Sequence, residues 1–130
     1  TGVDVSKEGI NLVKQNINDK SKINLIVGAA EDFKTNEKFD LVVATGLLHF
    51  LSGRKVKKVV SNMQQFTKVG GVNVIGVKMQ QNYRRDLPHV FRPRELKRYY
   101  KNKNWKIIEY AEKARRKPSK TAIIIAKKLK

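Results

Sequence analysis

The sequence predicts an α/β domain: an open, mostly parallel sheet with helices on both faces and a C-terminal antiparallel hairpin. Short apolar segments rich in valine and isoleucine alternate with longer segments whose apolar residues recur at helical spacing. The alternation ends on two successive apolar segments, 105–110 and 121–127, with no helix between them, which predicts the hairpin. A chain of 130 residues is the size of one domain, so we expect residues 1–130 to form a single domain.

The first half of the chain is predicted to run strand, helix, strand, strand. A β-branched segment at 1–5 precedes Ser6, a residue type that caps helices, and the helix is expected at 7–18. A second strand is expected at 23–27. The nearly continuous apolar run at 39–45 is typical of a strand buried on both faces of a parallel sheet, so we expect it to be a central strand.

The second half continues the pattern, with a helix expected at 54–67, a strand at 72–79 and a helix at 94–101. Residues 80–93 between the last two are polar and basic and contain Pro88 and Pro93, which argue against a regular helix. We therefore expect a mobile connection there. In such sheets ligands bind at the carboxyl ends of the strands, so the loops after Val5, Val27, Thr45 and Met79 are the candidate site.

Composition excludes several classes of site and leaves the partner open. The chain has no cysteine and only two histidines, which excludes disulfides, thiolate zinc sites and cysteine nucleophiles, and we expect no metal. No apolar run reaches the roughly 20 residues of a membrane helix, so we expect no membrane partner and a cytoplasmic location. Lysine and arginine number 29 against 11 aspartates and glutamates, a net charge of +18. This charge attracts polyanions without sequence preference, or simply maintains solubility.

Five sequence blocks occur in an order and spacing that resemble the class I methyltransferases: TGVDVS, GAAEDF, KFDLVVATGLLHFL, NMQQFTKVGGVNVIGV and FRPRELKRYY. Within that class the chain is most similar to the tellurite-resistance-type methyltransferases, and the likeness spans nearly the whole sequence. The resemblance implies a Rossmann-like fold and an enzyme that uses S-adenosylmethionine as its cofactor. It also implies that Gly70-Gly71 forms a structural turn, in which glycine permits positive φ at a helix end.

The resemblance assigns cofactor contacts at two successive strand ends. Asp4, with Val5 beside it, matches the acidic residue that holds the cofactor ribose, since a carboxylate can accept two hydrogen bonds from a diol. The alternative is that Asp4 only caps the following helix. Ala30, Glu31 and Asp32 match the segment that lines the adenine. Ala29 stands where the family usually has an acidic residue, so Glu31 or Asp32 either replaces that residue or is simply solvated.

The resemblance places the methionine part of the cofactor, and the methyl acceptor, above the backbone of Thr45, Gly46 and Leu48. Glycine at position 46 would allow close backbone approach. His49 resembles a histidine that often follows this strand, although a partly buried histidine is more often a packing residue than a base. His49, Tyr83 and His89 are candidate catalytic residues by loop position only. We expect Asp4 and the turn at Gly46 to lie side by side at one rim of the sheet.

The family's first strand and glycine-rich loop precede the TGVDVS block, and nothing in this chain matches them. That strand would lie between the strands ending at Val5 and Thr45, so its absence leaves two apolar strand edges unpaired. We therefore expect Thr1 to be a boundary with further residues upstream.

Three functions remain open. The first is methyl transfer to a small molecule. The second is methylation of RNA or DNA, bound by stacking on Tyr83, Phe91, Tyr99 and Tyr100 and by phosphate contacts. The basic residues for those contacts would be Arg84, Arg85, Arg92, Arg94, Arg115, Arg116 and Lys117. If Phe91 and Tyr100 belong to the core, they cannot stack. The third is a basic binding protein that keeps the fold without catalysis, since fold does not imply function. The sequence does not predict the oligomeric state.

Overall fold

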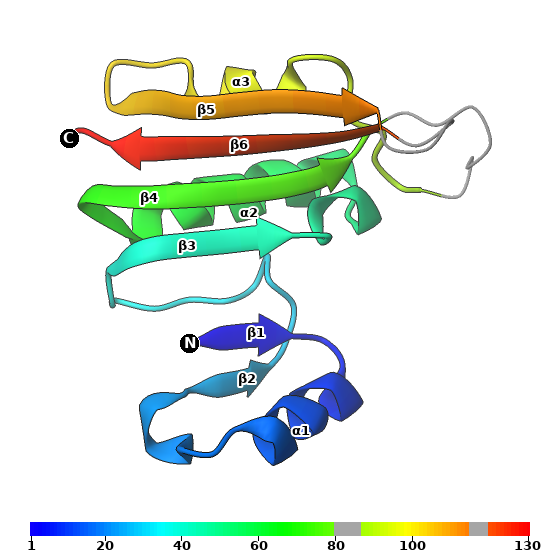
Figure 1. Cartoon of the computed structure of the whole chain (residues 1–130), viewed down its shortest axis with the longest axis vertical. Coiled ribbons are helices and arrows are strands. Elements are labelled where there is room, and N and C mark those ends of the chain that lie inside the picture. Colours follow the sequence, from blue (N-terminus) through cyan, green and yellow to red (C-terminus); the bar gives the residue numbers. More distant parts are fainter. Residues whose placement is uncertain (80–86, 115–119) are drawn as a thin grey trace. The chain divides into compact units, whose positions relative to one another are not determined.

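A computed structural model describes residues 1–79, 87–114 and 120–130 of the chain. The chain divides into two compact units, Thr1–Thr35 and Asn36–Lys130, and each unit is described by itself (Figure 1). The predicted α/β class is confirmed, because both units combine strands with helices.

The first unit is a two-stranded parallel sheet with one helix. Strand β1 (Gly2–Asp4) leads into α1 (Lys7–Asn16), and a short 3-10 helix, η1 (Lys20–Lys22), precedes β2 (Leu25–Val27). The two strands pair in parallel from Gly2 opposite Leu25 to Asp4 opposite Val27. Ser6 caps α1 as predicted, since its Oγ accepts a hydrogen bond of 2.9 Å from the Gly9 amide. These elements confirm the predicted order, with shorter strands and a helix that ends earlier.

The second unit is built on a four-stranded sheet in the order β3-β4-β6-β5. Its elements along the chain are β3 (Phe39–Thr45), η2 (Leu48–Phe50), α2 (Gly53–Phe66), β4 (Thr67–Lys78), α3 (Glu95–Tyr100), β5 (Trp105–Ala114) and β6 (Lys120–Lys128). Strands β3 and β4 are parallel, whereas β6 runs antiparallel to both β4 and β5. The C-terminal antiparallel hairpin is therefore confirmed, and the sheet of this unit is mixed.

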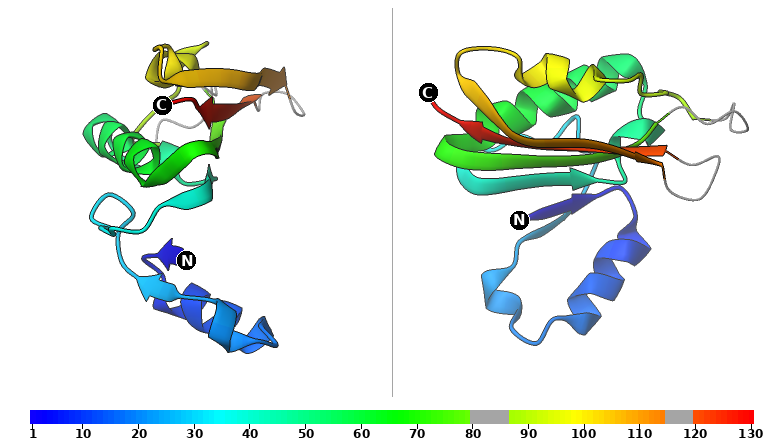
Figure 2. Two further views of the ribbon diagram at one scale, coloured as in Figure 1. Left: turned by 90° about the vertical axis from the view of Figure 1, so that its left-hand side faces the viewer. Right: turned by 45° about the horizontal axis from the view of Figure 1, so that its top comes forward.

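Strand β3 differs from its prediction. The expectation of a central strand buried on both faces is wrong, because β3 is the edge strand of the four-stranded sheet. An unpaired edge here agrees with the expectation drawn from the missing strand of the family. The side chains of Leu41 and Val43 are 57% and 53% exposed. An apolar run predicts that side chains favour burial, but it does not say which strands pair on each side. Within this unit α2 and α3 lie on the same face of the sheet rather than on opposite faces (Figure 2).

The junction of α2 and β4 also differs from its prediction. Helix α2 ends at Phe66 and β4 begins at Thr67, without the predicted loop before residue 72. Gly70 has the predicted positive φ, at 83°, but it lies inside β4 rather than at a helix end. The pairing of β3 with β4 shifts register at this point, between Phe39 and Leu41. The glycine therefore accommodates an irregular start of the strand.

The core of this unit lies between the sheet and its two helices. Ile75 and Ile124 from the strands, Val60 from α2 and Leu96 from α3 are at most 1% exposed. Buried polar groups join the layers: the Thr67 hydroxyl donates to the Met63 carbonyl at 2.6 Å, and Asn73 Nδ2 donates to the Tyr100 hydroxyl at 3.0 Å. Such groups are tolerated in a core only when they are hydrogen-bonded to one another.

Helix α2 has no basic residue in its last turn, and β6 supplies one. Lys128 Nζ donates to the carbonyl oxygens of Gln64 and Thr67, at 2.8 and 2.9 Å. These carbonyls lie at the negative end of the helix dipole, so the lysine satisfies them and stabilises the helix end.

Candidate functional site

In the first unit, the predicted ribose-binding carboxylate lies at the carboxyl end of the two strands. Asp4 is exposed and ends β1 opposite Val27, and its carbonyl accepts a 2.8 Å hydrogen bond from the Gly28 amide. Its Oδ1 accepts from the Ser6 amide at 2.7 Å, so the local capping role is present. A carboxylate has about four acceptor positions, so this contact leaves room for a diol. Val5 beside it is 72% exposed.

The segment after β2 forms a tight turn at the same end of this sheet. The Ala29 carbonyl accepts from the amides of Asp32 and Phe33, at 3.0 and 3.1 Å. The turn buries Glu31, which is 6% exposed, and leaves Asp32 exposed. Asp32 is therefore the acidic side chain of this turn that can reach a ligand, while Ala30 can contribute backbone groups. The structure thus brings Asp4 and residues 30–32 to the same end of the paired strands β1 and β2, and their contacts with a cofactor stay predictions.

In the second unit, the turn after β3 is set by Gly46. Gly46 has a φ of 73°, which glycine adopts without strain, and its amide donates to the Gly76 carbonyl of β4 at 3.0 Å. Thr45 is exposed, whereas the Leu48 side chain is fully buried at 0% exposure. A contact of Leu48 with a cofactor would therefore have to use its backbone. The predicted juxtaposition of Asp4 with Gly46 stays a prediction.

His49 lies in η2 and is 1% exposed. Its Nδ1 accepts a hydrogen bond of 3.3 Å from the Lys78 amide, and its ring contacts Phe50 with the centroids 4.3 Å apart. Nε2 is buried and has no hydrogen-bond partner in the part of the chain that the structure describes. Burial lowers the pKa of this imidazole, and the nearby charge of Lys78 lowers it further. Both effects favour the neutral ring, as does the hydrogen bond that Nδ1 accepts.

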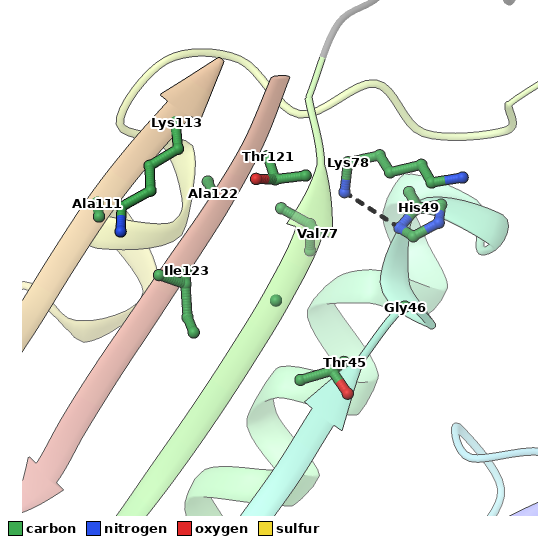
Figure 3. Close-up of a pocket in the computed structure, with 11 residues that line it drawn as sticks. Thr45, Gly46, His49, Val77, Lys78, Ala111, Lys113, Thr121, Ala122 and Ile123 are labelled. Atoms are coloured by element: carbon green, nitrogen blue, oxygen red, sulfur yellow. Dashed lines mark hydrogen bonds between the residues drawn. The ribbon is translucent and has the colours of Figure 1, made fainter. Parts of the chain in front are cut away.

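A pocket of about 470 Å³ opens where the strands of the second unit end (Figure 3). Two rows of paired residues cross the sheet on the face opposite the helices. The first row runs from Thr45 through Gly76 and Ile123 to Ala111, and the second from Lys78 through Thr121 to Lys113. His49 and Gly46 border the pocket on the β3 side, across from Lys113 on β5 (Figure 3).

Gly76 leaves the floor of this pocket open. A Cβ atom at position 76 would lie 3.3 Å from Thr45 Cγ2, so a side chain there would fill the space beside Thr45. Glycine within a strand often marks a place where a ligand or another backbone approaches closely.

The pocket lining is positive. Its charged residues are Lys78 and Lys113, its hydroxyl-bearing residues are Thr45 and Thr121, and no carboxylate is among the described residues that line the pocket. Cations gathered in a concave surface focus a field that attracts anions. The pocket can therefore take a small anion or a small molecule that carries a negative group.

The other catalytic candidates do not join this pocket. His89 Nε2 lies 2.7 Å from Glu95 Oε1, and Glu95 Oε2 accepts from the Arg92 amide at 2.9 Å. This pair holds the start of α3 and is outside the pocket lining. Tyr83 lies outside the described residues.

Two of the four aromatic residues predicted to stack on nucleic-acid bases are buried. Phe91 and Tyr100 are each 1% exposed and belong to the core, so they cannot stack on bases. Arg92 and Arg94 are exposed, as the hypothesis requires. The remaining basic candidates lie outside the described residues: Arg84, Arg85, Arg115, Arg116 and Lys117.

Most of the pocket lining was missed by sequence reasoning. Lys78 and Gly76 lie in a predicted strand and Thr121 and Ile123 in another, but we assigned them no role. Their signal is period-2 alternation: every second residue from Val72 to Lys78 is less buried than its neighbours. This alternation predicts which side chains share one face of the sheet, but it does not predict which strand pairs with this one.

Two searches of residues 1–79, 87–114 and 120–130 were negative. No helix there is long and apolar enough to cross a membrane. No three histidine, cysteine, aspartate or glutamate side chains there lie together as a metal site would require.

Comparisons with known proteins show which proteins this chain resembles. The model of the family described as "Tellurite resistance protein TehB" matches residues 1–121. A probable S-adenosyl-L-methionine-dependent methyltransferase TehB from Haemophilus influenzae is 33% identical over 105 residues, which are 76% of this chain and 34% of that protein. The chain thus spans about a third of the length of this curated relative.

Solved structures share the fold. The crystal structure of TehB from Haemophilus influenzae superposes with a TM-score of 0.78 at 26% identity, over 97% of this chain and 48% of that one. The N-methyltransferase NodS from Bradyrhizobium japonicum, solved with S-adenosyl-L-homocysteine, gives a TM-score of 0.76 at 18% identity, over 98% of this chain and 65% of that one.

Proposed function

This chain belongs to the tellurite resistance protein TehB family, and we propose that the protein transfers a methyl group from S-adenosylmethionine to a small anionic acceptor. The observation that carries the acceptor class is the pocket at the strand ends of the second unit, with two lysines and no carboxylate among its described lining residues. Its volume of about 470 Å³ is in the range of small-molecule sites.

The residues of the first unit fit the ribose and adenine ends of the cofactor. Asp4 presents an exposed carboxylate at the end of β1, and the backbone of Gly28 adjoins it. Asp32 is exposed in the next turn and can replace the acidic residue that the family has at position 29. We assign Asp4 to the ribose, and Ala30 with Asp32 to the adenine.

The cofactor, when bound, supplies a methyl group on a positively charged sulfur, which is already a strong electrophile. The chain's residues then have mainly to align the acceptor. Holding two reactants at attack distance can contribute about 7 to 11 kcal/mol, so no dedicated base is required when the acceptor is already an anion. Lys78 and Lys113 would hold the acceptor. Gly46 and Gly76 have no side chains, so the acceptor could approach the backbone closely at these two positions.

The experiment compares two aspartates in the full-length protein. Asp4→Ala should weaken binding of S-adenosylhomocysteine about tenfold to a hundredfold in calorimetry, the effect of losing hydrogen bonds to a charged group. Asp19→Ala is the matched control, because Asp19 Oδ1 also accepts from the amide two residues on, at 3.1 Å from Ser21 N. Both variants lose the hydrogen bond that a carboxylate accepts from the amide two residues on. Equal affinity of the two variants for S-adenosylhomocysteine would therefore contradict the ribose role of Asp4.

The acceptor is tested by transfer of a labelled methyl group. The full-length protein is given inorganic oxyanions, small organic carboxylates and single-stranded RNA in separate reactions. Label on a small anion supports the proposal. Label on RNA alone would favour the nucleic-acid alternative. A folded full-length protein without measurable affinity for S-adenosylhomocysteine would favour the non-catalytic alternative.

A further inference from the structure

The hydrogen bonds between β3 and β4 continue past the end of β3 in an unusual way. In a parallel ladder, a residue whose amide donates to residue j−1 of the neighbouring strand accepts with its carbonyl from the amide of residue j+1. Gly46 donates to the Gly76 carbonyl, so a regular ladder would pair its carbonyl with the Lys78 amide. Instead the Lys78 amide donates to Nδ1 of His49, at 3.3 Å.

Gly46 explains why the ladder changes. Its φ of 73° ends the strand and turns the backbone out of the extended conformation, so its carbonyl no longer continues the ladder. The side chain of His49, three residues later, takes the place of the missing backbone acceptor. The turn from Gly46 to His49 is thereby attached to β4 at two successive points, Gly76 and Lys78.

We propose that His49 is a positioning residue: its neutral imidazole, with the proton on Nε2, holds the Gly46–Leu48 turn on the end of β4 and so fixes one wall of the pocket. This inference rests on the proposed function, because that turn is the segment assigned to the methionine part of the cofactor. It assigns His49 a role different from that of a general base.

The contacts of the ring argue against a base. A base needs a free lone pair that reaches the acceptor, and the lone pair of Nδ1 is already used by the Lys78 amide. The remaining ring nitrogen must then carry the proton, and it is buried without a hydrogen-bond partner among residues that the structure describes. A buried N–H donor without a partner destabilises the fold. The hydrogen bond that Nδ1 accepts is therefore made even though it leaves the Nε2–H group unpaired.

Two variants separate a positioning role from a base. His49→Asn keeps an acceptor, because asparagine Oδ1 is the same number of bonds from the backbone as Nδ1. His49→Phe keeps an aromatic ring and has no acceptor. In the full-length protein, His49→Phe should weaken S-adenosylhomocysteine binding roughly tenfold, the effect of one lost hydrogen bond, whereas His49→Asn should remain close to wild type.

Two NMR measurements test the contact directly. In the wild type, ¹⁵N spectra of the ring should show the neutral tautomer protonated on Nε2. Exchange of the Lys78 amide proton should be slow in the wild type and in His49→Asn and at least tenfold faster in His49→Phe. The tautomer is measured on the wild-type protein. It therefore tests whether Nδ1 accepts the hydrogen bond from the Lys78 amide even if His49→Phe does not fold.

The contrary outcomes are distinct. A proton on Nδ1, or a Lys78 amide that exchanges equally fast in all three proteins, would overturn the positioning role. Unchanged cofactor affinity with an equal loss of kcat in both variants would indicate a base instead. If wild-type protein does not bind S-adenosylhomocysteine, the proposed function fails, and the tautomer and the exchange rates still decide whether His49 holds the turn.

Discussion

On the helix-covered face of the four-stranded sheet, Ile75 and Ile124 are fully buried, whereas the next residues along the same strands line the pocket on the other face. Ile75 is followed by Gly76, and Ile124 is preceded by Ile123. Because side chains alternate between the faces of a strand, one residue along the chain separates a core position from one that faces the pocket. Substitutions on the two faces should therefore affect stability and activity separately.

The largest effect should come from the covered face. Ile124→Ala removes a side chain that is 0% exposed and should lower the free energy of unfolding by about 3 to 4 kcal/mol, measured by urea denaturation. Ile125→Ala is the matched control, because the same residue type one position along lies half-buried on the other face. Its cost should be about 1 kcal/mol or less. Equal costs would mean that the two faces are packed alike.

A second test of the covered face uses alkaline pH. Burial raises the pKa of Tyr100 from 10 to about 12, so the unfolded chain loses this proton first as the pH rises. Stability from this group is fully present below pH 10 and falls between pH 10 and 12, by about 2 to 3 kcal/mol in total. Lysines titrate in the same range, so the measurement is the difference in pH dependence between wild type and Tyr100→Phe. Parallel stability curves would contradict the buried phenol.

The open face is tested at the pocket floor. Gly76→Val fills the space beside Thr45 and should lower kcat/KM for methyl transfer at least roughly tenfold, while valine's preference for strands keeps the protein folded. Gly71→Ala is the contrasting control in the same strand. Its Cβ would lie 3.0 Å from the carbonyl oxygens of Asp40 and Lys68, so it should reduce stability. Full activity in Gly76→Val would place the acceptor elsewhere.

The smallest effect concerns the pocket charge. Lys113→Gln should raise KM for an anionic acceptor about threefold to tenfold, with less effect at high salt, because exposed charges are screened. Lys106→Gln removes the same charge from the same strand, where Lys106 pairs with Lys127, far from the row of Lys113 and Thr121. If the two variants behave alike, the charge acts through the general field of the protein.

Periodicity explains what the sequence could predict. The helical spacing of Val56, Val59, Val60 and Met63 located α2 to within about one residue at each end, and all four side chains are buried. The prediction of a parallel sheet put the loops after Val5 and Val27 at one edge of it, and the observed parallel pairing of β1 with β2 agrees with this.

Strand pairing explains most of what the sequence could not predict. The pocket row joins Gly76, Ile123 and Ala111, which lie far apart in the chain and meet only through the register of β4, β6 and β5. The contact of His49 with the Lys78 amide joins a side chain to a backbone group, and residue types carry no signal of it.

The contact of Lys128 with the end of α2 has a consequence for synthesis on the ribosome. The helix comprises residues 53–66, and the lysine that contacts the carbonyl of Gln64 comes more than sixty positions later. While the chain is being made, the carbonyl of Gln64 has only water as a partner for this contact. This contact is therefore completed only after β6 has emerged from the exit tunnel and joined the sheet.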